Sequence, residues 1–304
     1  MNSRLFKYGI LVLTAVISNG CEKDVKNVDL PPFEKKLAIA SFISPSDSGI
    51  FVFVSSNQKL YGDLSIKEET GNLSGTISDG TKEVALDTTA NGLFLSHAKM
   101  PVQYGMTYYL KVKNDEGLHV EAVSTVPGKR DLELRIDSFS YVSHIEPIHE
   151  QPDYIYYTMD FQLSLADYPG EKNFYRMKVI SVAYKTDTLS GKQYKYYSDL
   201  LLNRDYFSNV SREYFTDSGL DGSKIIFKES IMTYDTNYSY YDSAFMKVYL
   251  YNTEESYYLY HTSLDKYRDS ENPFTEITPV YSNVTGGLGV FTSYTDDSLI
   301  CRLK

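Results

Sequence analysis

The sequence of 304 residues contains no tryptophan, only two cysteines, and fewer basic than acidic residues, 30 against 40, for a net charge of −10. This charge argues against nucleic acid as a partner, because nucleic-acid-binding surfaces gather Lys and Arg on one face. It gives no support to an anionic membrane surface as a partner either. Two cysteines allow at most one disulfide, between Cys21 and Cys301.

Long hydrophobic runs are also scarce. The one notable run covers residues 8–17, follows Arg4 and Lys7, and ends in small and polar residues. This pattern predicts a signal peptide at residues 1–20, too short for a transmembrane span. Its removal leaves 28 basic against 40 acidic residues, a net charge of −12. No other apolar stretch approaches the ~18 residues that cross a bilayer.

A cysteine ends this segment. Cys21, preceded by Gly20, resembles the lipobox cysteine of bacterial lipoproteins, although Ser18 stands where an aliphatic residue is usual. We therefore expect lipidation of Cys21, followed by a polar tether up to residue 36. A lipidated Cys21 would leave Cys301 as a lone, packed thiol. Ordinary cleavage, with Cys21 free or disulfide-bonded to Cys301, is the alternative.

The sequence pattern of residues 37–127 predicts short strands. Runs such as KLAIASFI, GIFVFVSS and TYYLKVK alternate apolar and polar side chains, and turn residues such as SPSDSG and NDEG separate them. This spacing predicts an immunoglobulin- or fibronectin-like sandwich. In YGMTYYLKV, Tyr108 or Tyr109 is expected to form the corner whose hydroxyl bonds to nearby backbone.

Residues 128–304 are expected to form a larger antiparallel β domain with one packed helix near residues 253–269. Pro127 and Gly128 mark the hinge, and strands are expected in ELRIDSFSYV, DYIYYTMDFQLSLAD, NFYRMKVISVAY, SKIIFKES and AFMKVYLYN. Asn252 with Glu255 resembles a capping box at the start of the helix. Inserts are expected around residues 186–222 and 232–242.

The C-terminal GGLG, residues 286–289, raises the question of a phosphate-binding loop. Such loops precede a helix N-terminus, whereas here a helix precedes the glycines and LGVFTSY reads as a strand. We interpret GGLG as a structural bend beside a closely approaching backbone.

The segments NPF and YSNVTGGLGVF resemble the C-terminal signature of the domain-of-unknown-function family 4249, lipoproteins of the Bacteroidota. CEKDVKNVDLPPFEKKLAIASFIS, GMTYYLKVKNDEGLHVEAVSTVP and YFTDSGLDGSKIIF resemble other parts of the family pattern. Ile277 and Thr278 depart from it, since a Pro-Val pair is commoner there.

The resemblance implies a protein of no established biochemical activity. Family members tend to be encoded beside TonB-dependent outer-membrane transporters, which implies an accessory lipoprotein on or near such a barrel. EKD after Cys21 resembles the acidic signal that sends lipoproteins of this phylum to the outer leaflet, so cell-surface exposure is expected rather than the periplasmic face.

The sequence gives only weak support for a metal site or a catalytic site. His144, Glu146, His149, Glu150 and Asp153 gather in an expected irregular segment without zinc-site spacing, and solvated polar groups explain them. The pairs Asp217/Asp221 and Asp296/Asp297 offer oxygen ligands without an EF-hand pattern, and turn capping explains them. A G-x-S-x-G motif is absent, and Cys301 has no nucleophile signature. We expect no catalytic residue, no metal site and no cofactor.

The tyrosines are the compositional anomaly: there are 29, of which 23 lie between Tyr154 and Tyr294. A tyrosine ring suits both cross-strand pairing in sheets and contact with ligands or partners. Tyrosines in two expected loops are the candidates for ligand or partner contact: Tyr194, Tyr196, Tyr197, Tyr234, Tyr238, Tyr240 and Tyr241.

The sequence thus predicts a lipid-anchored, mainly β outer-membrane protein, a non-enzymatic accessory of a TonB-dependent nutrient uptake system. A structural or adhesive surface lipoprotein is the alternative, and a hydrolase is the weakest reading.

Overall fold

The computed structural model describes residues 32–59, 70–88, 93–97, 100–130, 133–146, 154–200, 213–233, 241–269 and 278–303. The expected signal peptide, Cys21 and most of the tether lie outside these ranges. Lys35–Lys304 form one compact unit. The fold is mainly β, and the described helix, α2 (Glu255–Asp269), is neither long nor apolar enough to cross a bilayer.

The N-terminal strands are β1 (Leu37–Ile43), β2 (Gly49–Ser56), β3 (Leu73–Ser78), β4 (Glu83–Ala85), β5 (Asp87–Thr88), β6 (Leu93–His97), β7 (Thr107–Asn114) and β8 (His119–Thr125). The later strands are β9 (Arg135–Glu146), β10 (Tyr154–Ala166), β11 (Phe174–Thr186), β12 (Gln193–Leu200), β13 (Tyr214–Thr216), β14 (Lys224–Thr233), β15 (Ser243–Thr253) and β16 (Leu288–Arg302).

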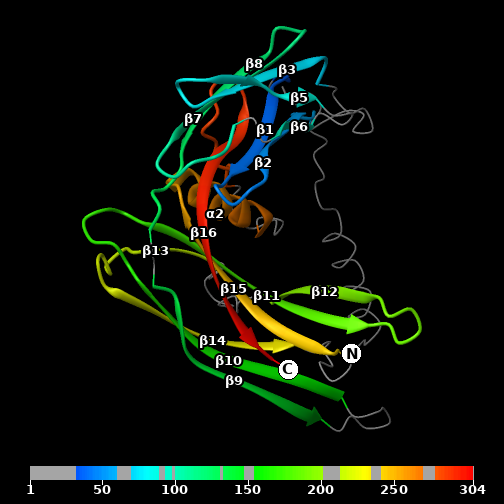
Figure 1. Ribbon diagram of the computed structural model, residues 1–304. Coiled ribbons are helices and arrows are strands. Elements are labelled where there is room, and N and C mark those ends of the chain that lie inside the picture. The colour runs from blue at the N-terminus through cyan, green and yellow to red at the C-terminus, as the bar shows by residue number, and fades with distance from the viewer. Residues whose placement is uncertain are drawn as a thin grey trace, which may run out of the picture. The chain divides into compact units, whose positions relative to one another are not determined.

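These strands form three sheets (Figure 1). The largest has the order β12-β11-β15-β16-β1-β2-β6-β5, with β13 beside β11. The second is β14-β10-β9, and the third is β4-β3-β7-β8. Alternating burial in β1, β2, β7 and β8 confirms the period-two pattern of the expected sandwich strands.

Tyr108 fills the expected tyrosine corner. Its buried hydroxyl donates to the Pro101 carbonyl at 3.0 Å and accepts from the Gln103 amide at 2.9 Å. Tyr109, the other candidate, points outward and is 42% exposed. Burial raises the pKa of the Tyr108 hydroxyl.

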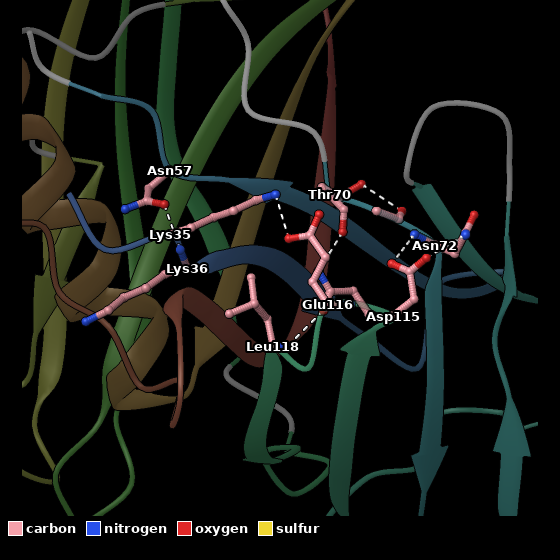
Figure 2. A network of polar contacts seen from close by, with 10 residues as sticks. Lys35, Lys36, Asn57, Thr70, Asn72, Asp115, Glu116 and Leu118 are labelled. Carbon is pink, nitrogen blue, oxygen red and sulfur yellow. Dashed lines mark hydrogen bonds and ion pairs between the residues drawn. The ribbon is translucent and has the colours of Figure 1, made fainter.

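The β7–β8 turn fixes the start of the compact unit (Figure 2). Lys35 Nζ contacts Glu116 Oε2 at 2.7 Å, and Asp115 accepts hydrogen bonds from the backbone and side chain of Asn72. Asn114 Oδ1 accepts the amides of Glu116 and Leu118, which closes the turn. Residues immediately before β1 are therefore held against the NDEG turn.

Strand β16 belongs to both halves of the large sheet. Its first residues pair in parallel with β1, and its later residues pair antiparallel with β15 (Figure 1). Phe291 is buried in the core of the N-terminal sandwich, although it lies far beyond residue 127. The second core, with Met159, Phe161 and Val248, lies between the large sheet and β9-β10-β14. A single strand thus joins the two cores.

GGLG is the bend that feeds β16, as the sequence predicts. A Cβ on Gly289, which has φ +104°, would collide with the Ile39 carbonyl oxygen of β1. One on Gly286 would come within 2.5 Å of the His119 carbonyl oxygen. Glycine is required because the chain passes against two backbones here.

Two local predictions were wrong. Asn252 is not the helix N-cap, because β15 continues to Thr253; the carbonyl of Glu254 instead accepts the amides of Tyr257 and Tyr258. Residues 193–200, expected within an insert, form β12, because their backbone pairs with β11 although their side chains do not alternate in burial. The NPF segment lies outside the described residues.

Candidate contact surface

The candidate tyrosines of the first expected loop lie on β12, the edge strand of the large sheet. Tyr194, Tyr196 and Tyr197 are 42%, 43% and 64% exposed, so they lie at the surface although the segment is not a loop. Tyr196 contacts the ring of Tyr241 at 5.3 Å between centroids, which brings members of both candidate groups together. Tyr234, Tyr238 and Tyr240 lie outside the described residues.

Cross-strand register places several aromatic and basic residues on one face of the large sheet. Directly paired residues share a face, and Val182 pairs with both Tyr197 of β12 and Phe245 of β15. The core residues Met177 and Val179 occupy the alternate positions of β11, so this face points away from β9-β10-β14. We define the tyrosine face by six of its residues: Tyr184, Lys195, Tyr197, Lys247, Tyr249 and Tyr251.

Cations lie over the rings of the tyrosine face. Lys195 Nζ is 4.8 Å from the ring centroid of Tyr197 and 5.7 Å from that of Tyr184. Lys247 Nζ is 4.3 Å from that of Tyr249. A hydrogen bond to Tyr197 raises the pKa of Lys195. Such tyrosine rings can stack on a ligand, and their hydroxyls and the neighbouring ammonium groups can donate hydrogen bonds to its oxygens.

One end of this face is closed by α2. Arg176 Nη1 donates to Tyr257 Oη at 2.7 Å, Nη2 lies 3.4 Å from Glu213, and the guanidinium lies over the Tyr214 ring. His261 stacks on Tyr214 at 5.2 Å with an interplanar angle of 14°. These contacts hold the helix on the sheet, while Arg176 Nε and His261 Nε2 are buried without a hydrogen-bond partner among the described residues.

Burial sets the titration of this closed end. Desolvation, with the charges of Arg176 and Arg268, lowers the pKa of His261 to about 3. Desolvation also raises the pKa of Tyr251 to about 12. Both groups are therefore neutral at physiological pH, and Arg176 with Glu213 provides the ionic pair.

The carboxylates of Asp217 and Asp221, in the segment DSGLDG, lie close to that of Asp167. Oxygens of Asp167, Asp217 and Asp221 lie within 4.8 Å of one another, and the first two side chains are buried. Each accepts internal hydrogen bonds: Asp167 from Tyr175 and the Gly222 amide, Asp217 from Asn173, and Asp221 from the Gly170 amide. The carboxylates thereby lock two neighbouring turns, as expected for turn capping.

The other candidate ligand groups are not brought together in the described residues. His144 and Glu146 lie on β9, which corrects their expected placement in an irregular segment; His149, Glu150 and Asp153 lie outside the described ranges. Asp296 accepts hydrogen bonds from Ser44 and Ser46, and Asp297 is exposed on β16. Cys301 is a free, partly buried thiol at the edge of the second core.

A shallow groove of mixed polar and apolar lining lies on the sheet β14-β10-β9. Its volume is about 520 Å³, and its polar lining includes Ser140, Asp160, Gln162 and Lys228. Of these lining groups, Ser140 and Asp160 bond to each other at 3.4 Å, and Gln162 bonds to Asp137 beyond the groove at 3.2 Å.

Sequence reasoning missed Tyr184, Lys195, Lys247, Tyr249 and Tyr251. A signal existed: Lys247, Tyr249 and Tyr251 alternate along a strongly patterned strand, opposite the buried Met246, Val248 and Leu250. What the sequence could not give is the register that places Lys195 and Tyr197 on the same face.

Fold and surface together define a mainly β protein with an aromatic, cation-bearing sheet face. The chain belongs to the family described as Domain of unknown function (DUF4249), whose profile matches residues 23–300. None of the curated proteins compared with the chain matches it.

Two solved structures show a distant likeness. One is described as the structural basis for the promiscuous specificity of carbohydrate-binding modules from the β-sandwich superfamily, with 10% identity, a TM-score of 0.18, and coverage of 72% of this chain and 97% of that one. The other is the B domain of a biofilm-associated protein, with 7% identity, a TM-score of 0.15, and coverage of 87% and 85%. Neither likeness carries an argument about this chain.

Proposed function

We propose that this protein is a lipid-anchored, non-enzymatic accessory component of a TonB-dependent nutrient uptake system at the outer membrane. Cys21 would carry the lipid, and the cell surface is the proposed location. The resemblance of the first 36 residues to an exported lipoprotein supports the anchor, and the genomic association of the family supports the transporter.

The observation that carries the binding role is the tyrosine face. Tyr197 is 64% exposed, and its neighbours Lys195 and Lys247 lie over exposed or partly exposed rings. Exposed tyrosines are enriched at contact surfaces, and the lysines beside them can add charge complementarity to a partner. We propose that the barrel, its substrate, or both bind across this face.

Co-purification tests this function. The full-length tagged protein is isolated from gently solubilised outer membranes, and mass spectrometry identifies the partners and the N-terminal peptide. The proposal predicts acyl groups on Cys21 and a TonB-dependent barrel at near one-to-one ratio. An acylated protein without a barrel would instead support the structural or adhesive role, and an unmodified Cys21 would refute the anchor.

A further inference from the structure

Strand β12 ends the large sheet with an open edge. It pairs with β11 on one side, and among the described residues no strand pairs with it on the other (Figure 1). Residues 193–199 are all exposed, and the strand is eight residues long. An edge of this length is a ready template for another strand.

Hydrogen-bond alternation shows which β12 groups face this open edge. The Asp187 amide donates to the Lys192 carbonyl at 2.9 Å, and the Met177 amide donates to the Glu213 carbonyl on the same side of β11. Odd-numbered residues of β11 therefore bond toward β12, and their partners on β12 are even-numbered. It follows that Lys195, Tyr197 and Asp199 direct their N–H and C=O groups away from β11.

In one antiparallel register, the outward-facing residues of one copy of β12 are complementary to those of a second copy. A register centred on Lys195 or on Asp199 would place like charges directly opposite, which is destabilising. A register centred on Tyr197 instead places each Lys195 opposite the Asp199 of the other copy, and Tyr197 opposite Tyr197. Among these three centres, only Tyr197 pairs both charges favourably.

Both side chains keep capacity for these pairs beside their present contacts. Asp199 contacts Lys178 through Oδ1 at 3.0 Å, but its side chain stays 65% exposed and its second oxygen can accept further donors. Lys195 lies over two tyrosine rings, and its ammonium carries three donors.

We infer that β12 is a self-association edge: two copies of this chain pair antiparallel about Tyr197, which extends the large sheet across both molecules. About six backbone hydrogen bonds and two Lys195–Asp199 pairs would form. Such an interface is smaller than that of a stable soluble dimer, so the association is reversible. Lys195 and Tyr197 also belong to the tyrosine face, but this inference does not require the proposed transport role.

Site-directed disulfide crosslinking in outer membranes tests the register. Full-length protein with Cys301→Ser carries either Tyr197→Cys or, as the control, Leu189→Cys; Leu189 is 97% exposed on the β11–β12 turn. Residues paired across the two-fold axis lie about 5.5 Å apart between Cα atoms, within disulfide reach. On mild oxidation, Tyr197→Cys is expected to form dimer at least tenfold more than Leu189→Cys.

Charge reversal tests the pairing itself. In the Tyr197→Cys background, Lys195→Asp places carboxylates opposite each other and is expected to reduce crosslinking at least fivefold. Adding Asp199→Lys restores opposite charges and is expected to restore crosslinking. Thermal unfolding of each variant separates these effects from misfolding.

The inference is overturned if Tyr197→Cys crosslinks no better than Leu189→Cys. It is also overturned if charge reversal leaves crosslinking unchanged, or if the adduct contains a different protein in place of a second copy. Because the readout is the dimer and not the barrel, failure here is distinct from failure of the proposed function.

Discussion

Gly289 allows β16 to lie directly against β1. Its φ of +104° and the position of the Ile39 carbonyl leave no room for a side chain. The same contact brings Phe291 into the N-terminal core and Asn283 beside β16, where the Asn283 side chain donates to the Phe291 carbonyl and accepts its amide. The glycine thus determines how one strand serves two cores.

We predict that Gly289→Ala lowers the free energy of unfolding by more than about 3 kcal/mol, because strain and a backbone collision act together. Gly191→Ala is the matched control: Gly191 also has positive φ, +69°, but its Cβ would meet open space. We expect the control to cost about 1 kcal/mol. Denaturant unfolding measures both, and equal costs would contradict the close approach.

His261 gives a pH dependence whose sign follows from its lowered pKa. Its pKa is about 3 in the folded protein, below the ordinary value of 6.5, because it is partly buried beside Arg176. The unfolded chain therefore binds a proton that the folded protein does not. Stability from this group is complete above pH 6.5 and is lost as the pH falls toward 3.

We predict that His261→Phe makes stability less dependent on pH between 6 and 4.5. The wild-type slope should be steeper by up to about 1.4 kcal/mol per pH unit, the value for one proton. Phenylalanine keeps the ring contacts with Tyr214 and Phe42. Urea unfolding at pH 6.0, 5.25 and 4.5 gives the two slopes, and identical slopes would show that His261 titrates normally.

Among the elements, the start of α2 is tied to both halves of the molecule by Glu254. Its carboxylate accepts the hydroxyls of Ser124 on β8 at 2.7 Å and of Thr292 on β16 at 3.2 Å. Both hydroxyl residues are fully buried. Glu254 also donates its amide to the Ser293 carbonyl, so a single residue links helix, sandwich and shared strand.

We predict that Glu254→Ala destabilises the fold by about 3 kcal/mol, because it removes charged hydrogen bonds and leaves the buried Ser124 hydroxyl without its acceptor. Glu255→Ala is the neighbouring control. Glu255 is exposed and pairs with Lys172 at 3.0 Å, so its loss should cost less than about 1 kcal/mol. Calorimetry measures the transition temperatures of both variants. Similar transition temperatures would contradict the role of Glu254 in linking helix, sandwich and shared strand.

The sequence predicted elements best where side chains alternate. β2 and β7 match their expected segments because buried and exposed positions alternate along them, and α2 matches because its residues repeat at helical spacing. β12 was missed because all but its last residue are exposed, so only backbone pairing defines it. Asn252 was misassigned because a helix-capping motif and the end of a strand can have the same amino-acid sequence.

The sequence predicted only part of the candidate surface. Composition pointed to tyrosines at the surface, and Tyr194, Tyr196 and Tyr197 are exposed. The register between β11, β12 and β15 could not be predicted, and it places Tyr197 on the tyrosine face and Tyr194 and Tyr196 on the opposite face of β12. The resemblance in NPF and GGLG identified the family, which the profile over residues 23–300 confirms.

At the scale of the whole molecule, an acidic chain presents one sheet face that carries lysines and tyrosines. The chain carries a net charge of −10, yet Lys195 and Lys247 lie on one sheet face beside Tyr184, Tyr197 and Tyr249. Lys195 and Lys247 can pair with acidic groups of a partner, and Asp199 and Asp296 place acceptors on the same face. We propose that the partner binds across this face.

The most direct test is quantitative co-purification of the barrel with wild-type protein and with the double variant Lys247→Ala/Tyr249→Ala. Both residues lie on β15, away from the β12 edge, and Leu189→Ala is the exposed control. We predict at least a tenfold loss of bound barrel for the double variant, unchanged thermal stability, and no loss for the control. Equal recovery of the barrel with all three proteins would contradict the claim that the tyrosine face is the contact surface.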